Sequence, residues 1–301
     1  MRAVLANACV LLVLALTPGP ARPAADVGDA TSSGLTIPDS VPQGGLIRGK
    51  LPAGSTLSLL PPLSSISPGS QQQAAIAVRV GGDGGFVVGV GRDESGPVRL
   101  AATLPDQSRI SLSIPVLARK WQIERIEGVP ESTVNPPPEI AARIEREQAE
   151  VSLARQRDDD RNDFEAGFAW PLRGRVSGVY GSQRIYNGTP KSPHSGLDVA
   201  AAKGTPVHAP AGGIISFANP DLYLTGGTVL IDHGHGLSSS FLHLSRIDVR
   251  VGERVDPGEV IGLVGATGRA TGPHMHWGMN WFGVRVDPQL LVDPVRAPVE
   301  P

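Results

Sequence analysis

The 301-residue sequence has almost no cysteine, and this limits the chemistry that it can use. Its single cysteine, Cys9, lies in the first apolar stretch. If that stretch is removed as a signal peptide, the remaining chain has none, which excludes disulfides and thiolate metal sites. A metal ion would then be held by His, Asp or Glu side chains.

The sequence also has no excess of basic charge. Lys and Arg total 27 against 29 Asp and Glu, and the formal net charge is -2. Few positive charges are therefore free to neutralise a phosphate backbone. We expect no nucleic-acid partner.

Long hydrophobic runs are missing as well. After Arg2 an apolar run extends to Leu16. It has the length of a signal-peptide core and is shorter than the roughly 18 residues that a spanning helix needs. We predict a signal peptide over residues 1–25, a periplasmic or secreted protein, and no stable membrane insertion after cleavage. The alternative is an uncleaved N-terminal membrane anchor.

Glycine and proline are abundant, with 37 and 28 residues, so we expect many turns and few long helices in a mainly β protein. From residue 32 to 120, short alternating segments between turn signals predict an N-terminal β domain, a small β-sandwich or barrel. The predicted strands are Leu46–Gly49, Thr56–Leu60, Ala75–Val80, Phe86–Val90, Val98–Ala101 and Ile110–Ile114. We find no cluster of chemically active residues among them.

The sequence pattern over residues 135–163 predicts a Pro-rich linker that is followed by one charged connecting helix, Glu139 to Arg161. Prolines come first, acidic residues follow early, and good helix formers dominate the rest. We expect the apolar stripe of this helix to lie on a neighbouring domain; a regulatory or partner-binding arm is the alternative. The run Asp158 to Asp160 lacks the Gly and Glu of a calcium loop and is interpreted as solvated.

Residues 164–292 form a third region, followed by a C-terminal tail over 293–301. This region is again rich in short strands, but it differs from the others because it holds every histidine of the chain. They are His194, His208, His233, His235, His243, His274 and His276. Histidines scattered over the surface would be expected to occur in the other two regions as well.

His274 and His276 flank Met275 in an alternating segment. As a strand, this segment sends both imidazoles to one face, about 6.6 Å apart along the chain. Both imidazoles can therefore reach the same small volume. One of them can bind a metal ion while the other acts on a bound water or substrate.

His194 and Asp198 supply further ligand atoms. Pro193, Gly196 and Val199 argue against a helix here, and on a fully extended strand the two side chains would lie about 13 Å apart. We therefore predict a tight turn at Gly196 that leads into a strand near Leu197 to Ala200.

Together, His194, Asp198 and one histidine of the later pair make three nitrogen and oxygen ligands. This count leaves a fourth position open for water, as in catalytic zinc sites. Zinc would lower the pKa of that water towards 7 and polarise a carbonyl oxygen, which implies hydrolysis. His243 is our candidate proton acceptor, whereas His208, His233 and His235 are interpreted as structural.

These residues resemble the LytM and lysostaphin type of zinc metallopeptidases, which cut peptidoglycan peptides. The resemblance covers Pro171 to about Leu291 and rests on five motifs in the family's order. They are His194-x-x-x-Asp198, Gly204-Thr205-Pro206-Val207 with Ala209-Pro210-Ala211-Gly212-Gly213, Val229-Leu230-Ile231-Asp232-His233-Gly234, Leu242-His243-Leu244-Ser245, and Gly265-Ala266-Thr267-Gly268 leading to His274-x-His276.

The resemblance implies one zinc ion per chain, with His194, Asp198 and His276 as ligands and peptidoglycan as the partner. It implies that His243 and His274 surround the reacting water, without deciding which is the general base. The activity implied is that of an exported metalloendopeptidase acting on stem peptides or cross-links. The alternative is a non-enzymatic regulator that activates other cell-wall hydrolases.

The implied fold is an antiparallel β-sheet groove related to the biotinyl and lipoyl carrier hairpins, and Val251 to Ile261 resembles that hairpin. A carrier protein would need a lysine at the hairpin tip, and this segment has none. A phosphohistidine protein would be cytoplasmic, which the predicted signal peptide contradicts.

Overall fold

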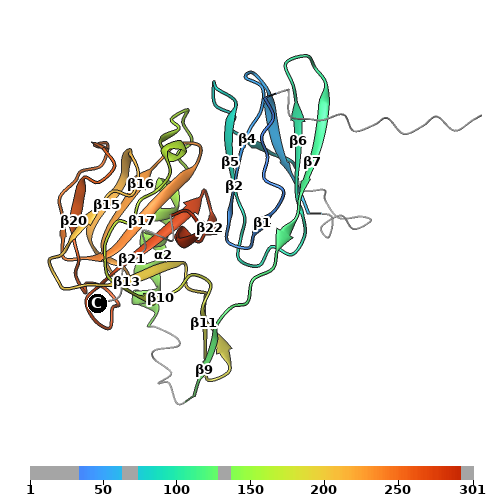
Figure 1. Cartoon of the computed structure of the whole chain (residues 1–301). Coiled ribbons are helices and arrows are strands. Elements are labelled where there is room, and N and C mark those ends of the chain that lie inside the picture. Colours follow the sequence, from blue (N-terminus) through green and yellow to red (C-terminus); the bar gives the residue numbers. More distant parts are fainter. Residues whose placement is uncertain (1–33, 63–73, 128–136, 293–301) are drawn as a thin grey trace, which may run out of the picture.

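The computed structural model describes residues 34–62, 74–127 and 137–292. The predicted signal peptide, the start of the Pro-rich linker and the C-terminal tail lie outside them. The described chain is mainly β with one α-helix, which confirms the predicted class (Figure 1). Among these residues no helix has both the length and the apolar character needed to cross a bilayer.

The N-terminal part consists of small sheets. Strands were predicted in all six of its alternating segments, and a strand is present in each. The pairs and sheets are β2 (Leu46–Lys50) with β5 (Gly85–Gly89); β4 (Ile76–Val78), β3 (Thr56–Leu60), β6 (Val98–Thr103) and β7 (Arg109–Ile114); and the parallel pair β1 (Val41–Pro42) and β8 (Val116–Leu117). Their inward side chains, among them Ile47, Val88 and Leu100, are fully buried.

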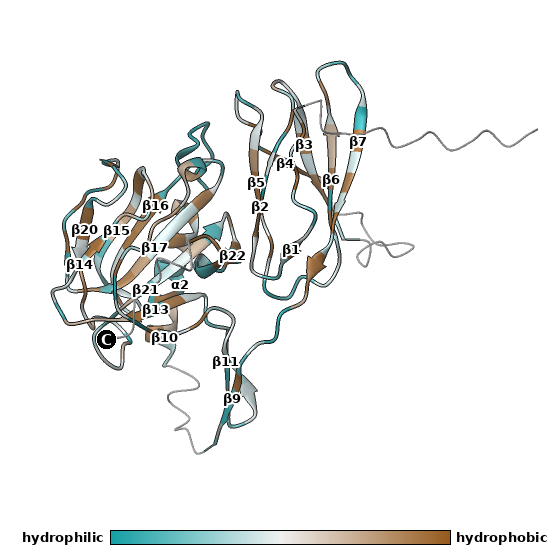
Figure 2. Ribbon diagram, viewed as in Figure 1, coloured by the Kyte–Doolittle hydropathy of each residue, from teal (hydrophilic) through white to brown (hydrophobic). Residues whose placement is uncertain are grey.

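The C-terminal part is built on one eight-stranded antiparallel sheet. Its order is β10 (Arg175–Gly178), β13 (Gly196–Ala200), β21 (His274–Trp281), β17 (Leu237–Leu244), β16 (Gly226–Asp232), β15 (Gly213–Leu222) and β19 (Arg254–Val255), with β22 (Val284–Val286) paired to β21. Met275 and Trp277 of β21 and Phe241 of β17 are completely buried. Figure 2 shows apolar residues concentrated in the strands and polar residues in the connecting loops.

Two three-stranded sheets complete this part. One contains β14 (Pro206–His208), β20 (Val260–Leu263) and β18 (Arg246–Ile247), and the other β12 (Thr189–Pro190), β11 (Gln183–Tyr186) and β9 (Ile123–Ile126). The segment Val251 to Ile261 does not form a self-paired hairpin, so that expectation was wrong. Its strand β19 pairs with β15, whereas β20 pairs with β14 and β18, so its turn links two sheets.

The helix α2 (Pro138–Ala154) is shorter than predicted. Val151 and Ala154 pack against Leu222 and Leu230 of the large sheet, so one side of the helix does lie on a neighbouring domain, although Leu153 of the expected stripe is exposed. The helix ends at Ala154, and beyond it the Arg157 Nε donates to the Asp232 carboxylate at 3.0 Å. Helical periodicity in the sequence does not reveal this long-range pairing.

The aspartate run is not simply solvated, as we had interpreted it. Arg79 of the N-terminal part donates from Nε to Asp158 at 2.5 Å and from Nη1 to Asp160 at 3.2 Å, and Arg161 pairs with Asp159 at 3.0 Å. The run therefore joins the N-terminal sheets to the C-terminal sheet. Sequence alone could not reveal this because the Arg79 partner lies far away in the chain.

Candidate metal centre

The centre is built on one rung of the large sheet. Asp198 of β13 lies opposite His276 of β21, and Leu242 of β17 lies opposite His276 on its other side. Side chains on neighbouring strands at one rung are close enough to touch. The Asp198 Oδ1 and the His276 Nδ1 are 2.8 Å apart.

His194 reaches this rung from the loop before β13. Its amide donates to the Ser182 carbonyl at 2.7 Å, and its carbonyl accepts from the Gly181 amide at 2.9 Å. Its Nδ1 donates to the Val179 carbonyl at 3.0 Å. Because a carbonyl can only accept, the Nδ1 carries the proton and the Nε2 lone pair is directed to the rung.

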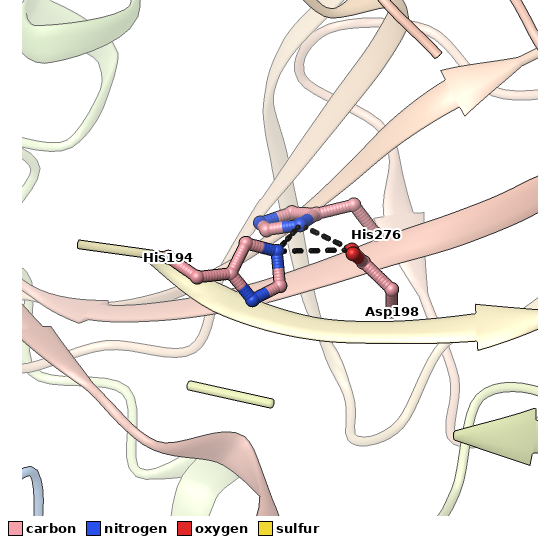
Figure 3. A group of neighbouring side chains, drawn as sticks. All are labelled: His194, Asp198 and His276. Carbon is pink, nitrogen blue, oxygen red and sulfur yellow. Dashed lines mark hydrogen bonds and ion pairs between the residues drawn. The ribbon is translucent and has the colours of Figure 1, made fainter. Parts of the chain in front are cut away.

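The three ligand atoms form a compact triangle (Figure 3). The His194 Nε2 lies 3.1 Å from both the Asp198 Oδ1 and the His276 Nδ1. Ligand bonds of about 2.0–2.2 Å around a tetrahedral zinc ion imply ligand separations of roughly 3.3–3.6 Å. Small outward shifts of these side chains would therefore admit the ion, and two nitrogens with one carboxylate oxygen are a suitable donor set.

Electrostatics at the rung favour the ligand forms of two of these groups. Burial raises the pKa of Asp198, but the hydrogen bonds and charges of the two imidazoles outweigh it and hold this pKa well below its usual range. Burial lowers the pKa of His276 to about 4. Burial also lowers the pKa of His194, but the hydrogen bond and charge of Asp198 outweigh it and leave this pKa raised. Protons therefore compete with a metal ion for the His194 Nε2 more strongly than they would at an ordinary histidine.

His243 enters the centre through a β-bulge. The pairing of β16 with β17 shifts between Gly227 and Val229, and His243 has a left-handed φ of 64°. A regular strand would put His243 on the same face as Phe241, but a bulge changes the direction of the side chain. The imidazole lies 4.7 Å from that of His274 and 6.5 Å from that of His276, centre to centre.

His274 lies two residues before His276 on the same strand. Its Nδ1 donates to the Gly272 carbonyl at 2.8 Å, and its Nε2 is 3.9 Å from the Asp198 Oδ1. The His243 Nδ1 donates in the same way to the Thr267 carbonyl at 2.8 Å. Both rings therefore keep an Nε2 lone pair that can accept a proton.

Two glycines that the sequence analysis did not assign to the site make room for it. A Cβ at Gly178 would lie 2.4 Å from the Asp198 Oδ2, and one at Gly196 would lie 2.7 Å from the His276 Nε2. Any larger residue would displace a ligand. Gly178 pairs with Asp198 across strands β10 and β13, so only strand pairing could have identified it.

The other three histidines lie outside this cluster. His233 is completely buried, with Nδ1 donating to the Gly212 carbonyl at 2.6 Å and Nε2 lying 2.8 Å from the Ser239 hydroxyl. His208 donates from Nδ1 to the Gly258 carbonyl at 2.8 Å. His235 packs edge-on against Phe164. Among the described residues, the group that could hold a metal ion consists of His194, Asp198 and His276; we refer to it as the metal-binding group.

Comparisons with known proteins agree with this arrangement. The model of Peptidase family M23 matches residues 192–288. A crystal structure of a Pseudomonas aeruginosa protein assigned to peptidase M23 is 33% identical, with a TM-score of 0.60. That match covers 84% of this chain and 95% of the other.

Two curated relatives match a part of the chain. The cell division protein DipM of Caulobacter vibrioides is 36% identical over 127 residues, which are 42% of this chain and 20% of DipM. The peptidoglycan DD-endopeptidase ShyA of Vibrio cholerae is 39% identical over 104 residues, 34% of this chain and 24% of ShyA. The matched part thus spans about a quarter or less of each of these proteins.

The Pseudomonas structure is matched over nearly its whole length, and the family model spans all three ligand positions of the rung. This chain belongs to peptidase family M23.

Proposed function

We propose that the protein is an exported, zinc-dependent metalloendopeptidase that hydrolyses an amide bond in peptidoglycan stem peptides or cross-links. One observation carries the proposal: ligand atoms of His194, Asp198 and His276 all lie within 4.8 Å of one another, and two further imidazoles stand beside them. Three protein ligands leave a position open, as catalysis at zinc requires. We propose one zinc ion per chain at this place.

His243 and His274 would carry the proton transfers. A bound zinc ion supplies a Lewis acid that activates water and polarises the substrate carbonyl. The Nε2 atoms of both histidines are free to accept a proton. One of them takes the proton of the attacking water and returns it to the leaving amine nitrogen, as general acid–base catalysis requires.

The proposed substrate rests on the family and on the relatives. ShyA, to which 104 residues of this chain are similar, is named as a peptidoglycan DD-endopeptidase. A cross-link between D-alanine and diaminopimelate is the bond we propose first. The predicted signal peptide supports a periplasmic or secreted protein, where the cell wall is accessible.

The alternative is a wall-binding regulator without catalysis. Such a protein has no need of metal ligands or proton acceptors, whereas all five positions are filled here by His194, Asp198, His243, His274 and His276. The complete set favours the enzyme. We also propose that the large C-terminal antiparallel sheet forms the substrate groove and that the N-terminal sheets form a small sandwich or barrel.

Zinc content and wall digestion test the function together. The purified protein is expected to contain about one zinc ion per chain and to release peptides from cell-wall sacculi. Chelation should abolish the release and added zinc should restore it, because the ligands stay in place. His208→Ala, outside the cluster, is the matched control. Zinc-free protein without activity, together with full function of His276→Ala in cells, would favour the regulator.

A further inference from the structure

A cavity of about 400 Å³ lies beside the metal centre. The helix α2 forms one wall with Ile144 and Val151, and the large sheet forms the other with Leu242. His276 and Ser195 also line it, so the cavity reaches the proposed ligands. Its volume lies within the range of small-ligand pockets.

Two arginines line this cavity from opposite elements. Arg155 follows the last residue of α2, and Arg285 lies in β22. Burial lowers the pKa of Arg155 to about 9, and the like charge of Arg285 adds to the effect. Burial also lowers the pKa of Arg285. Two guanidinium groups are thus held near each other in a partly desolvated place.

Neither guanidinium is paired with a carboxylate among the described residues. The Nε of Arg155 is buried and has no hydrogen-bond partner there. The Nη1 of Arg285 donates to the Asn280 Oδ1 at 3.0 Å, a neutral acceptor. Uncompensated buried charge is costly, so such a pair indicates a place where an anion is expected.

Asn280 adds a third donor to the cavity wall. Because its Oδ1 accepts from Arg285, its Nδ2 points elsewhere, and that atom is buried without a partner. Arg155, Arg285 and Asn280, whose side chains all carry N–H donors, therefore line one cavity. Guanidinium and amide N–H groups match the oxygens of a carboxylate.

The acidic residue in the cavity lining does not neutralise this pair. Glu147 accepts from the Arg143 Nε at 2.6 Å through Oε1, and from the Tyr223 amide at 2.8 Å through Oε2. Both of its oxygens are therefore occupied on the side of α2 that carries Arg143. The positive charges of Arg155 and Arg285 beside His276 therefore remain available to bind an anion.

We propose that Arg155, Arg285 and Asn280 form a subsite that binds a carboxylate of the peptide substrate. This inference rests on the proposed function and names the feature of the substrate that the site recognises. In a cross-link to diaminopimelate, the carbon bonded to the scissile nitrogen also carries a free carboxylate. Such a group next to the scissile bond would enter the cavity while the amide lies at the metal centre.

The subsite gives α2 a definite role, because Arg155 follows its last turn. With the helix in place, substrate binding gains one charged partner. A helix that only covered the groove would instead hinder binding, and loosening it would raise activity. The two roles predict opposite signs for the effect of Arg155→Ala.

The test compares two synthetic cross-linked peptides, one with the free carboxylate beside the scissile amide and one with a carboxamide there. The zinc-loaded full chain is expected to prefer the carboxylate. Arg155→Ala and Arg285→Ala should each lower kcat/KM for the carboxylate peptide by about tenfold or more, the usual value of a charged hydrogen bond. The same substitutions should lower kcat/KM for the carboxamide peptide much less. Arg155→Lys should recover part of the preference for the carboxylate peptide.

Arg146→Ala is the matched control, since Arg146 is an exposed arginine of the same helix outside the cavity lining. Zinc content and melting temperature establish that each variant is folded and loaded. Equal losses for both peptides, no loss, or a gain in Arg155→Ala would each overturn the proposal.

Binding separates this inference from the proposed function. Calorimetric titration of the zinc-loaded protein with the same two peptides, at times too short for cleavage, measures their binding affinities separately from hydrolysis. Carboxylate preference without any hydrolysis would refute the enzyme and leave the subsite standing. Hydrolysis of both peptides at equal rates and with equal affinities would refute the subsite and leave the proposed enzyme activity standing.

Discussion

The Asp198 Oδ1 lies 2.8 Å from the His276 Nδ1 and 3.1 Å from the His194 Nε2, so one carboxylate oxygen faces two imidazoles. Asp198 and His276 are paired across β13 and β21. Strand pairing therefore sets this distance, and the loop before β13 adds the third ligand.

Asp198→Asn should remove the negative ligand while keeping the side-chain shape. Zinc affinity should fall by more than about 100-fold, beyond the 10–100-fold that loss of a supporting partner causes. Competition with a chromogenic chelator measures this affinity. Asn219→Asp, a substitution of similar size on the exposed end of β15, is the control. Unchanged zinc affinity in Asp198→Asn would refute its role as a ligand.

His274→Ala should spare most of the zinc and lower turnover. His274 contributes no atom to the metal-binding group, and its free Nε2 suits proton transfer. General acid–base catalysis is worth about 100- to 10,000-fold. Zinc content and kcat are measured on the same preparation, and His243→Ala is expected to behave alike. A zinc loss equal to that of His276→Ala would show that the two residues are assigned in reverse.

Gly178→Ala should weaken zinc binding although Gly178 carries no ligand atom. A Cβ there would lie 2.4 Å from the Asp198 Oδ2, so the carboxylate must move. We expect zinc affinity to fall by roughly tenfold or more, as when a supporting partner is lost. Gly96→Ala, where a Cβ meets open space, is the matched control. Equal affinities in both variants would mean that the carboxylate moves without cost.

Protonation of His233 should lower the free energy of unfolding of the protein in mild acid. Burial lowers its pKa to about 4, whereas the unfolded value is about 6.5. Between these values the unfolded chain binds the extra proton, so stability is fully present above pH 6.5 and is lost as pH falls towards 4. The full loss is about 3 kcal/mol.

Comparison with His233→Asn isolates this contribution, since all other titrating groups are shared. The variant should be less stable at pH 8, because the contacts with Gly212 and Ser239 are weakened. The difference in the free energy of unfolding should then shrink as pH falls from 6.5 to 4. Denaturant titrations at several pH values measure it, and parallel curves for the two proteins would refute the prediction.

Much of the fold could be predicted locally. Alternation between turn signals indicated strands such as β2 and β6, and Pro138 with early acidic residues indicated the start of α2. The end of α2 was not predicted: the helix stops at Ala154, and Arg157 beyond it donates to Asp232, 75 residues further along, a contact that no local pattern reveals. Local patterns report local preferences only.

Which residue types are available is already visible in the sequence: a histidine-rich third region without cysteine, and the His-x-His and His-x-x-x-Asp spacings that imply a metal. The directions of these side chains depend on the folded chain. The bulge at His243, the clearance left by Gly178 and the approach of Arg155 to Arg285 depend on strand pairing and helix packing. These contacts join residues distant in the chain, and spacing along the chain does not encode such distances.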